Sequence, residues 1–293
     1  MLTIGEAFEK FKSRLEISAS EQKDASQRQL AIREHLRRSL AVQNDFLTGS
    51  YARDTKTRPL KDVDIFVVLQ ESEANYLGKA PDVVLDRFIE ILSLNYGGRI
   101  EKGNRSVKID FGDIAVADEQ IMSVDIVPAF ARGDAYLIPD RRQRTWITAN
   151  PRIHAEMATA ANATFSKQWK PIVKMVKKWN DHNQKPVKPT FLLEVMALEL
   201  LDGSWGGSYP RELRQFFASA ASRLDEEWPD PAGLGPPVTA RLSENTLERN
   251  AAIKALRSAE AASTEALRQD REGRIGAALD TWQELLGPRF AKS

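Results

Sequence analysis

Hydrophobic positions recur with two different periods along this chain, and the change of period divides it. Up to about residue 149, apolar runs of strand length alternate with helical patterns, whereas from about residue 150 onward the pattern is helical throughout. The strand patterns cover residues 44–70 (two strands around a polar loop), 99–111 (a hairpin turning at Gly103-Asn104), 121–130, 135–138 and 145–148. The sequence therefore predicts an α+β lobe at residues 1–149 and a helical lobe at residues 150–293.

Helical periodicity is expected in seven segments. These are residues 1–43, 81–94, 154–181, 191–201, 211–224, 243–266 and 272–286. Within the first segment, Asp24 or Ser26 is expected to cap a second helix, and Ser243 or Asn245 is expected to cap the helix at 243–266. Pro171 is expected either to kink the helix at 154–181 or to start a new one.

Composition narrows the class of protein without naming a function. The 293 residues, 42% hydrophobic and 28% charged, are typical of a soluble globular protein of one large or two ordinary domains. A net charge of +1 excludes the global basic field of a general nucleic-acid binder. The absence of cysteine excludes disulfides and thiolate zinc sites, and it fits a reducing compartment. We expect a cytoplasmic protein without a membrane span, since the longest apolar runs are too short for one.

The stretch FLTGSYARDTKTRPLKDVDIFVVL, residues 46–69, carries the strongest chemical signal. Side chains on a strand alternate between faces, so Asp62 and Asp64 project together, about 7 Å apart along the strand. Two ionised carboxylates on one face suit a hard cation such as Mg²⁺, which proteins hold with one or two carboxylates plus substrate phosphates. Gly49 allows close approach of the backbone to a phosphate, and Ser50 offers its N–H and hydroxyl as donors. The Asp62/Asp64 pair alone is commonly part of an ordinary strand edge, and Gly49-Ser50 alone is commonly an ordinary turn. Their combination, in this order, indicates a site.

Asp125 interrupts an otherwise apolar strand. A carboxylate between Val124 and Ile126 is costly to bury unless it is paired or bound to a cation. It is either a salt-bridged core residue or, given Asp62 and Asp64, the third carboxylate of a metal site. We favour the second interpretation.

Gly-Ser followed about a dozen residues later by Asp-x-Asp resembles the nucleotidyltransferase superfamily of DNA polymerase β. More narrowly, GSYARDT…DVDIFVVL is similar to the bacterial cGAS/DncV-like nucleotidyltransferases, the CD-NTases or SMODS proteins, and VDIVPA at residues 124–129 matches the strand of their third acid. The resemblance implies a polymerase β-like catalytic lobe, a mixed twisted sheet with flanking helices, braced by N-terminal helices. It also implies a C-terminal helical-bundle lobe that closes the nucleotide cleft. Two Mg²⁺ ions, with Mn²⁺ as an alternative, would be held by Asp62, Asp64 and Asp125 as catalytic residues.

The resemblance extends to nucleotide-binding residues of the helical lobe. VKMVKKW, residues 173–179, aligns with the family's helix that carries a triphosphate-contacting lysine. Lys177 is the position that matches this lysine best, and Lys174 is the second candidate. Thr190 and Phe191 stand where the family usually has Ser and Tyr, so a hydroxyl for phosphate and a ring for base stacking remain. The alternatives are a solvated lysine face, a plain helix cap at Thr190 and a core position at Phe191.

The resemblance implies synthesis of a cyclic di- or trinucleotide second messenger from NTPs, ATP and/or GTP, with release of pyrophosphate. In the family this serves antiphage signalling, through an effector of the same defence operon that reads the product. A linear, oligoadenylate-like synthase and a catalytically silent nucleotide sensor remain as alternatives. Without cysteines, the zinc-mediated DNA binding of animal cGAS is not expected.

Overall fold

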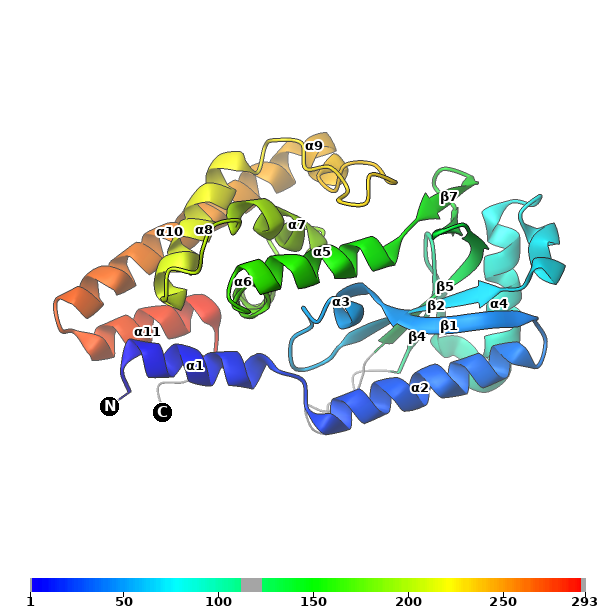
Figure 1. Ribbon diagram of the computed structural model, residues 1–293, viewed down its shortest axis with the longest axis horizontal. Coiled ribbons are helices and arrows are strands. Elements are labelled where there is room, and N and C mark those ends of the chain that lie inside the picture. The colour runs from blue at the N-terminus through cyan, green and yellow to red at the C-terminus, as the bar shows by residue number, and fades with distance from the viewer. Residues whose placement is uncertain (1, 112–122, 291–293) are drawn as a thin grey trace. The chain divides into compact units, whose positions relative to one another are not determined.

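A mixed β-sheet forms in the first half of the chain, and helices alone follow it (Figure 1). The computed structural model describes residues 2–111 and 123–290. Contacts divide the chain into two compact units: the sheet unit, Ile17–Ala155, and the helical unit, Met1–Glu16 with Glu156–Ser293. We expected one division at 149/150. The contacts instead draw the boundary at 155/156 and group the first sixteen residues with the helical unit.

The sheet has the strand order β1-β2-β5-β4-β3 over the described residues, with β6 paired to β5 and β7 to β6. Its strands are β1 Val42–Thr48, β2 Asp62–Leu69, β3 Ile100–Lys102, β4 Val107–Asp110, β5 Ser123–Arg132, β6 Ala135–Asp140 and β7 Thr145–Ala149. The pair β2/β5 is parallel and the other pairs are antiparallel, so the sheet is mixed as expected. Each expected strand is present, although Ile121 and Met122 of the strand expected at 121–130 lie outside the described residues.

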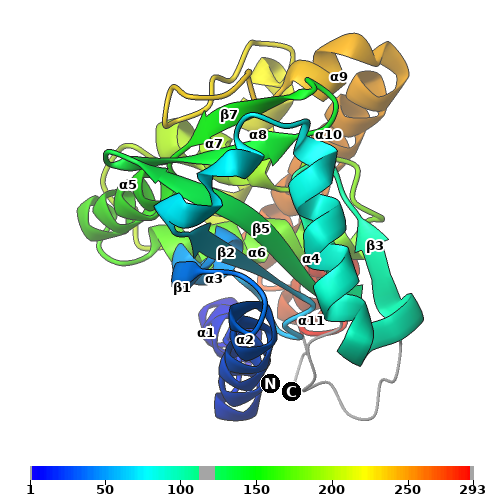
Figure 2. The same ribbon diagram turned by 90° about the vertical axis from the view of Figure 1, so that its right-hand side faces the viewer.

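Period-two alternation gives the sheet two different faces. Val63 and Ile65 of β2 are buried with Val124 and Ile126 of β5 in one core, under α2 (Ala19–Arg37) and α4 (Pro81–Tyr96). Figure 2 shows α4 lying along the sheet. Asp62 and Asp64 alternate with these residues and therefore lie on the opposite face of the sheet, where the candidate site is.

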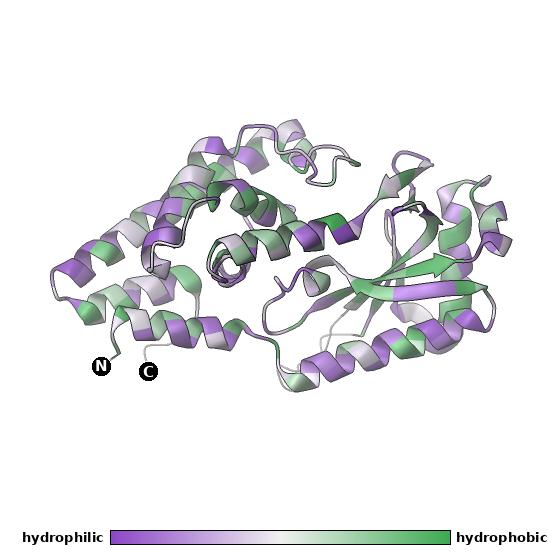
Figure 3. Cartoon of the chain, viewed as in Figure 1, coloured by the Kyte–Doolittle hydropathy of each residue, from purple (hydrophilic) through white to green (hydrophobic). Residues whose placement is uncertain are grey.

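The N-terminal segment forms two helices, α1 (Ile4–Leu15) and α2, separated at residues 16–18. The expected cap at Asp24 or Ser26 is wrong. Ser18 is the N-cap of α2, because its side chain accepts the Glu21 N–H while the Glu21 side chain reaches back, a capping box that starts the helix earlier. Most of α2 is hydrophilic (Figure 3), consistent with a helix that buries a narrow stripe against the sheet.

Short helices interrupt the sheet unit at three places: α3 (Gly49–Ala52) and the two 3-10 turns Glu71–Tyr76 and Gly97–Arg99. The remaining helices are α5 Pro151–Thr164, α6 Trp169–His182, α7 Phe191–Leu200, α8 Tyr209–Arg223, α9 Ala240–Glu244, α10 Thr246–Arg271 and α11 Ile275–Leu286. None of the helices in the described ranges is both long and apolar enough to cross a membrane.

The helical segment expected at 154–181 consists of two separate helices, α5 and α6. Ser166 and Lys167 adopt positive φ angles of 52° and 64°, which end α5 before α6 begins. Pro171 lies in the first turn of α6, which agrees with the alternative of a new helix start. The expected cap at Asn245 is confirmed, since its side chain accepts the Glu248 N–H.

Aromatic side chains tie α1 into the core of the helical unit. Phe8 is fully buried, with ring centroids 5.0 Å from Trp282 and 4.9 Å from Phe290. Phe11 packs on Phe290 at 5.4 Å. The first helix is therefore part of the helical unit's core rather than an appendage.

Candidate active site

The three candidate carboxylates come from two neighbouring parallel strands. In the register of β2 and β5, Asp64 is the direct partner of Asp125, and Asp62 is the partner of Ser123. Residues in register on adjacent strands point to the same face, so Asp62, Asp64 and Asp125 share one face of the sheet. The structure thus brings together acids that are 61 positions apart in sequence.

The glycine of the Gly-Ser pair stands directly against this face. Thr48, at the end of β1, pairs with Asp64, and Gly49 follows it with φ +60°. A β-carbon at residue 49 would overlap the Asp64 carboxylate, with Cγ only 2.8 Å away. Both the backbone angle and the lack of a side chain are needed here, so the glycine lets the bend close over Asp64.

Ser50 anchors the loop that follows the bend. Its carbonyl accepts the N–H groups of Thr55, at 3.0 Å, and Lys56, at 3.2 Å. Among the residues that the structure describes, its hydroxyl makes no hydrogen bond to the protein. The hydroxyl therefore remains available as a donor to a ligand.

Two serine hydroxyls hold carboxylates of the site. The Ser123 hydroxyl donates to Asp62 Oδ1, and the Ser106 hydroxyl donates to Asp125 Oδ1 at 2.7 Å. Sequence analysis missed both partners. Ser123 had a usable signal, since it shares a face with Asp125 by period two, whereas Ser106 is recognised only once the hairpin register is known.

Burial, more than the charge of neighbouring carboxylates, shifts the pKa of Asp125. Burial raises the pKa of the Asp125 carboxyl above its usual range, and Asp62 adds to the rise. The Ser106 hydrogen bond and the charge of Lys108, its direct partner on β4, counteract part of the rise in this pKa. The face that carries Asp62, Asp64 and Asp125 favours binding of a cation, which would offset the cost of the buried charge.

The donor chemistry of this face fits a hard divalent cation. Its candidate ligands are carboxylate oxygens, which suit Mg²⁺ and Mn²⁺. Within residues 2–111 and 123–290, no group of three or more His, Cys, Asp or Glu side chains already has the arrangement of a metal site. The carboxylates of Asp62 and Asp125 are instead each turned to a serine hydroxyl.

The lysines of α6 have different partners. Lys177 forms an ion pair with Glu194 of α7 at 2.9 Å, and both side chains are largely buried. Lys174 is buried and pairs with Glu16 at 2.7 Å. The alternative of a solvated lysine face is therefore wrong for both Lys174 and Lys177, since each is largely buried in an ion pair.

Thr190 and Phe191 open α7, one turn before Glu194. Thr190 occupies the N-cap position, but its side chain accepts no capping hydrogen bond, contrary to the plain-cap alternative. Phe191 is partly buried against the helical core, so the core alternative holds in part. Thr190 and Glu194 are four residues apart and share a helix face, and Glu194 is the ion-pair partner of Lys177.

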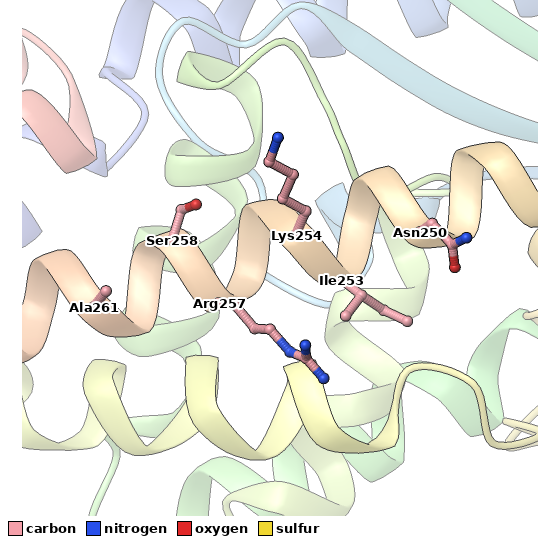
Figure 4. A pocket seen from close by; sticks show the side chains of 6 residues that line it. All are labelled: Asn250, Ile253, Lys254, Arg257, Ser258 and Ala261. Carbon is pink, nitrogen blue, oxygen red and sulfur yellow. The ribbon is translucent and has the colours of Figure 1, made fainter.

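Two hollows in the helical unit are lined by residues other than the candidate site residues. One of about 550 Å³ is lined along α10 by Asn250, Ile253, Lys254, Arg257, Ser258 and Ala261 (Figure 4). Another of about 680 Å³ lies between α8 and α10 and includes Arg211, Arg214 and Arg271. Neither of these two hollows includes a candidate site residue.

Comparison with known proteins agrees with this geometry. The family model "Second Messenger Oligonucleotide or Dinucleotide Synthetase domain" (SMODS) matches residues 2–162. A probable cyclic nucleotide synthase of Bacillus cereus (strain VD146) is 26% identical over 274 residues, covering 83% of this chain and 80% of the relative. The cyclic AMP-AMP-AMP synthase of Acinetobacter sp. (strain ATCC 27244 / 9458) is 25% identical over 289 residues, covering 88% and 78%.

Solved structures show the fold. The CD-NTase CdnG of Bradyrhizobium diazoefficiens, in complex with GTP, superposes with a TM-score of 0.74 at 15% identity, covering 97% of this chain and 95% of that one. CdnC of E. coli MS115-1, with ATP, gives a TM-score of 0.71 at 20% identity and covers 99% of each chain. The expected CD-NTase fold is therefore confirmed. The chain belongs to the SMODS family, the second messenger oligonucleotide or dinucleotide synthetases, and is a nucleotidyltransferase.

Proposed function

We propose that the reaction takes place on the face shared by Asp62, Asp64 and Asp125, and that it is the Mg²⁺-dependent joining of NTPs into a cyclic di- or trinucleotide with release of pyrophosphate. The observation that carries this assignment is the direct pairing of Asp64 with Asp125 across parallel strands, with Asp62 on the same face. The Gly49 bend, closed over Asp64, supports it.

The aspartates would divide two tasks. Asp62 and Asp64 would hold two Mg²⁺ ions and, through them, the triphosphate, while Asp125 would hold the second ion. Bound Mg²⁺ supplies charge neutralisation for the attacking and departing oxygens. Asp125 Oδ1 is held by Ser106, which leaves Oδ2 to bind the second ion, and the carboxylate would also help to take the proton of the attacking ribose hydroxyl. Burial raises the pKa of Asp125, which makes this carboxylate a stronger base than an exposed aspartate.

The remaining candidates would bind the nucleotide. The Ser50 hydroxyl and the Gly49-Ser50 backbone would contact the outer phosphates. Lys177, which uses one N–H on Glu194, keeps two further N–H groups for the departing pyrophosphate. The hydroxyl of Thr190 would donate to phosphate, and the ring of Phe191 would stack on a base, an interaction of roughly 1–3 kcal/mol.

ATP is the first substrate to test and a ring of three AMP units the first product to seek. A relative covering most of this chain is named a cyclic AMP-AMP-AMP synthase, and CdnC was solved with ATP. GTP stays in the test because CdnG was solved with it. We place the reaction in the bacterial cytoplasm, as the absence of cysteine suggests, with a defence effector as reader of the product.

The test is product formation from labelled NTPs. The protein is incubated with each labelled NTP and with a four-NTP mixture in Mg²⁺, then treated with phosphatase, and the products are identified by mass spectrometry. A phosphatase-resistant cyclic product made by the wild type and abolished in the folded double variant Asp62→Ala, Asp64→Ala supports the proposal. Asp134→Ala, which removes an exposed carboxylate of the same unit, is the matched control and should retain activity.

Three outcomes would contradict the proposal. Phosphatase-labile oligomers would identify a linear, oligoadenylate-like synthase. Nucleotide binding without any Mg²⁺- or Mn²⁺-dependent product would identify a silent sensor. Wild-type turnover in the double variant would remove Asp62 and Asp64 from the site.

A further inference from the structure

The turn between β3 and β4 reaches the carboxylate face and ends in a hydroxyl. Its first and last residues close it, since the Gly103 N–H donates to the Ser106 carbonyl at 2.9 Å. The Ser106 hydroxyl then donates to Asp125 Oδ1 at 2.7 Å. Ser106 directly precedes β4 and lies two positions before Lys108, the cross-strand partner of Asp125, so it is expected on the same side as Lys108.

The turn is held by the end of β6 and the residue after it, Asp140 and Arg141. Asp140, only 1% exposed, accepts hydrogen bonds from Asn104 Nδ2 at 3.2 Å and from Arg105 Nε at 2.8 Å. The Arg141 guanidinium donates to the Gly103 carbonyl at 3.1 Å, and the Arg141 N–H donates to the Asn104 carbonyl at 3.1 Å. Closing a hairpin requires none of these four contacts. They give the three residues before Ser106 fixed positions.

Gly103 leaves room for the serine. A β-carbon on residue 103 would lie 2.9 Å from both the carbonyl oxygen and the hydroxyl oxygen of Ser106. A side chain at position 103 would therefore have to displace the hydroxyl that contacts Asp125. The turn is thus built around the position of one hydroxyl group.

We propose that Ser106 is a positioning residue for the third carboxylate: it fixes Asp125 Oδ1 and presents Oδ2 to the divalent cation. The inference rests on the proposed function of the carboxylate face. A carboxylate held at one oxygen loses little rotational freedom when the other oxygen binds an ion. The folded protein has therefore already lost part of the side-chain entropy that ion binding would otherwise remove. Groups that hold a metal ligand in this way typically change metal affinity by 10–100-fold when removed.

The experiment measures cation binding directly, without turnover. Mg²⁺ and Mn²⁺ binding to the nucleotide-free protein is followed by titration calorimetry for the wild type, Ser106→Ala and Ser106→Thr. Initial rates against Mg²⁺ concentration at saturating ATP are measured alongside. We expect Ser106→Ala to weaken cation binding about tenfold and to raise the Mg²⁺ needed for half-maximal rate by a similar factor. The KM for ATP at saturating Mg²⁺ should stay unchanged, and Ser106→Thr, which keeps the hydroxyl, should stay close to the wild type.

Two further variants keep the test decisive. Ser39→Ala removes an exposed hydroxyl of the same unit and should bind cations normally. Arg105→Gln loosens the turn without touching Asp125, and it should weaken cation binding in the same direction but less. It also replaces Ser106→Ala if that variant does not fold.

Wild-type cation affinity in Ser106→Ala would overturn the inference. The same conclusion follows if Ser106→Ala causes an equal loss in an Asp125→Asn background, because the serine would then not act through Asp125. These results differ from failure of the proposed function. In that case the Asp62→Ala, Asp64→Ala variant itself would retain turnover, whatever Ser106 does.

Discussion

A single residue, Asp125, shows the conflict between stability and activity at this site. Its carboxyl lies on a partly buried face beside Asp62 and Asp64, and burial is the largest cause of its raised pKa. The folded protein therefore disfavours the charged form that metal binding requires. Ser106 and Lys108 favour the charged form and offset part of this cost.

Asp125→Asn should raise the free energy of unfolding of the metal-free protein at neutral pH. The raised pKa means that the folded wild type binds the Asp125 proton more tightly than the unfolded chain does, where the ordinary value is about 3.9. The wild type therefore gains stability from this group as the pH falls from above the folded pKa towards 3.9, and the asparagine variant does not. The difference in free energy of unfolding between Asp125→Asn and the wild type should therefore become smaller as the pH falls.

Urea unfolding of both proteins at a series of pH values checks this expectation. Asp134→Asn, at an exposed position, is the control and should show no such pH-dependent advantage. An advantage that is constant or grows as the pH falls would contradict the assigned direction of the Asp125 shift.

Gly49→Ala should abolish turnover and destabilise the protein. Alanine at φ +60° costs roughly 1–2 kcal/mol of backbone strain, and its β-carbon would displace the Asp64 carboxylate. Gly133→Ala is the matched control, since Gly133 has φ +58° with no atom within 4 Å of an added β-carbon. Unfolding and product assays should show similar stability losses in both variants and lost activity only in Gly49→Ala. Equal activity in the two would show that the close approach to Asp64 is not needed.

Sequence predicted the carboxylates and the glycine but not the groups that hold them. Period-two alternation is a local property, so Asp62 and Asp64 could be assigned to one face from neighbouring letters alone. The pairing of Asp64 with Asp125 depends on which strands are neighbours, and the motif resemblance supplied that information. The position of Ser106 depends on the hairpin register and on the contacts of Asn104 and Arg105 with Asp140, which no local pattern contains.

Two helices, α6 and α7, carry the candidate nucleotide-binding residues of the helical unit, Lys177, Thr190 and Phe191. Asn180 of α6 is fully buried and makes two hydrogen bonds of 3.0 Å with the backbone of Val187, in the loop that leads to Thr190. The Lys177–Glu194 ion pair joins the two helices directly. These contacts give the loop, the start of α7 and Lys177 one fixed arrangement, which a phosphate site requires.

Lys177→Met should raise the KM for ATP roughly tenfold or more, the effect of losing a hydrogen bond to a charged group. Lys174→Met is the matched control on the same helix. Lys174 is buried and pairs with Glu16, so this variant should lower stability and leave the KM for ATP nearly unchanged. Steady-state kinetics and thermal unfolding of both variants separate the two effects. A larger KM increase for Lys174→Met would reverse the assignment.

Helix boundaries were the least predictable part of the elements. The apolar stripe through residues 165–179 continues across the break between α5 and α6, because Phe165 and Trp169 are both core residues of the helical unit. Periodicity therefore indicated one helix where two contribute to one core. The break depends on positive φ angles at Ser166 and Lys167, residue types that do not mark such a turn as glycine does.

At the scale of the whole molecule, the chain order of the helical unit is discontinuous. Residues 1–16 belong to the unit that is otherwise built from residues 156–293, and the sheet unit is inserted between them. Composition and periodicity could not reveal this arrangement, because they describe neighbours in sequence and α1 packs on α11, far away in the chain. The sequence boundary near residue 150 reflected where strands end, not which core each helix joins.

Deletion of residues 2–16 should destabilise the helical unit selectively. The deletion removes the fully buried Phe8 and Phe11, and loss of one buried phenylalanine side chain typically costs about 3–5 kcal/mol. Hydrogen exchange followed by mass spectrometry should show faster exchange across residues 156–290 and nearly unchanged protection across residues 17–111 and 123–155. A point variant, Phe8→Ala, should reproduce the pattern more weakly, and Lys10→Ala, at an exposed position of the same helix, should not. Faster exchange in the sheet unit to the same degree would mean that α1 stabilises both units, and the discontinuous division of the chain would be wrong.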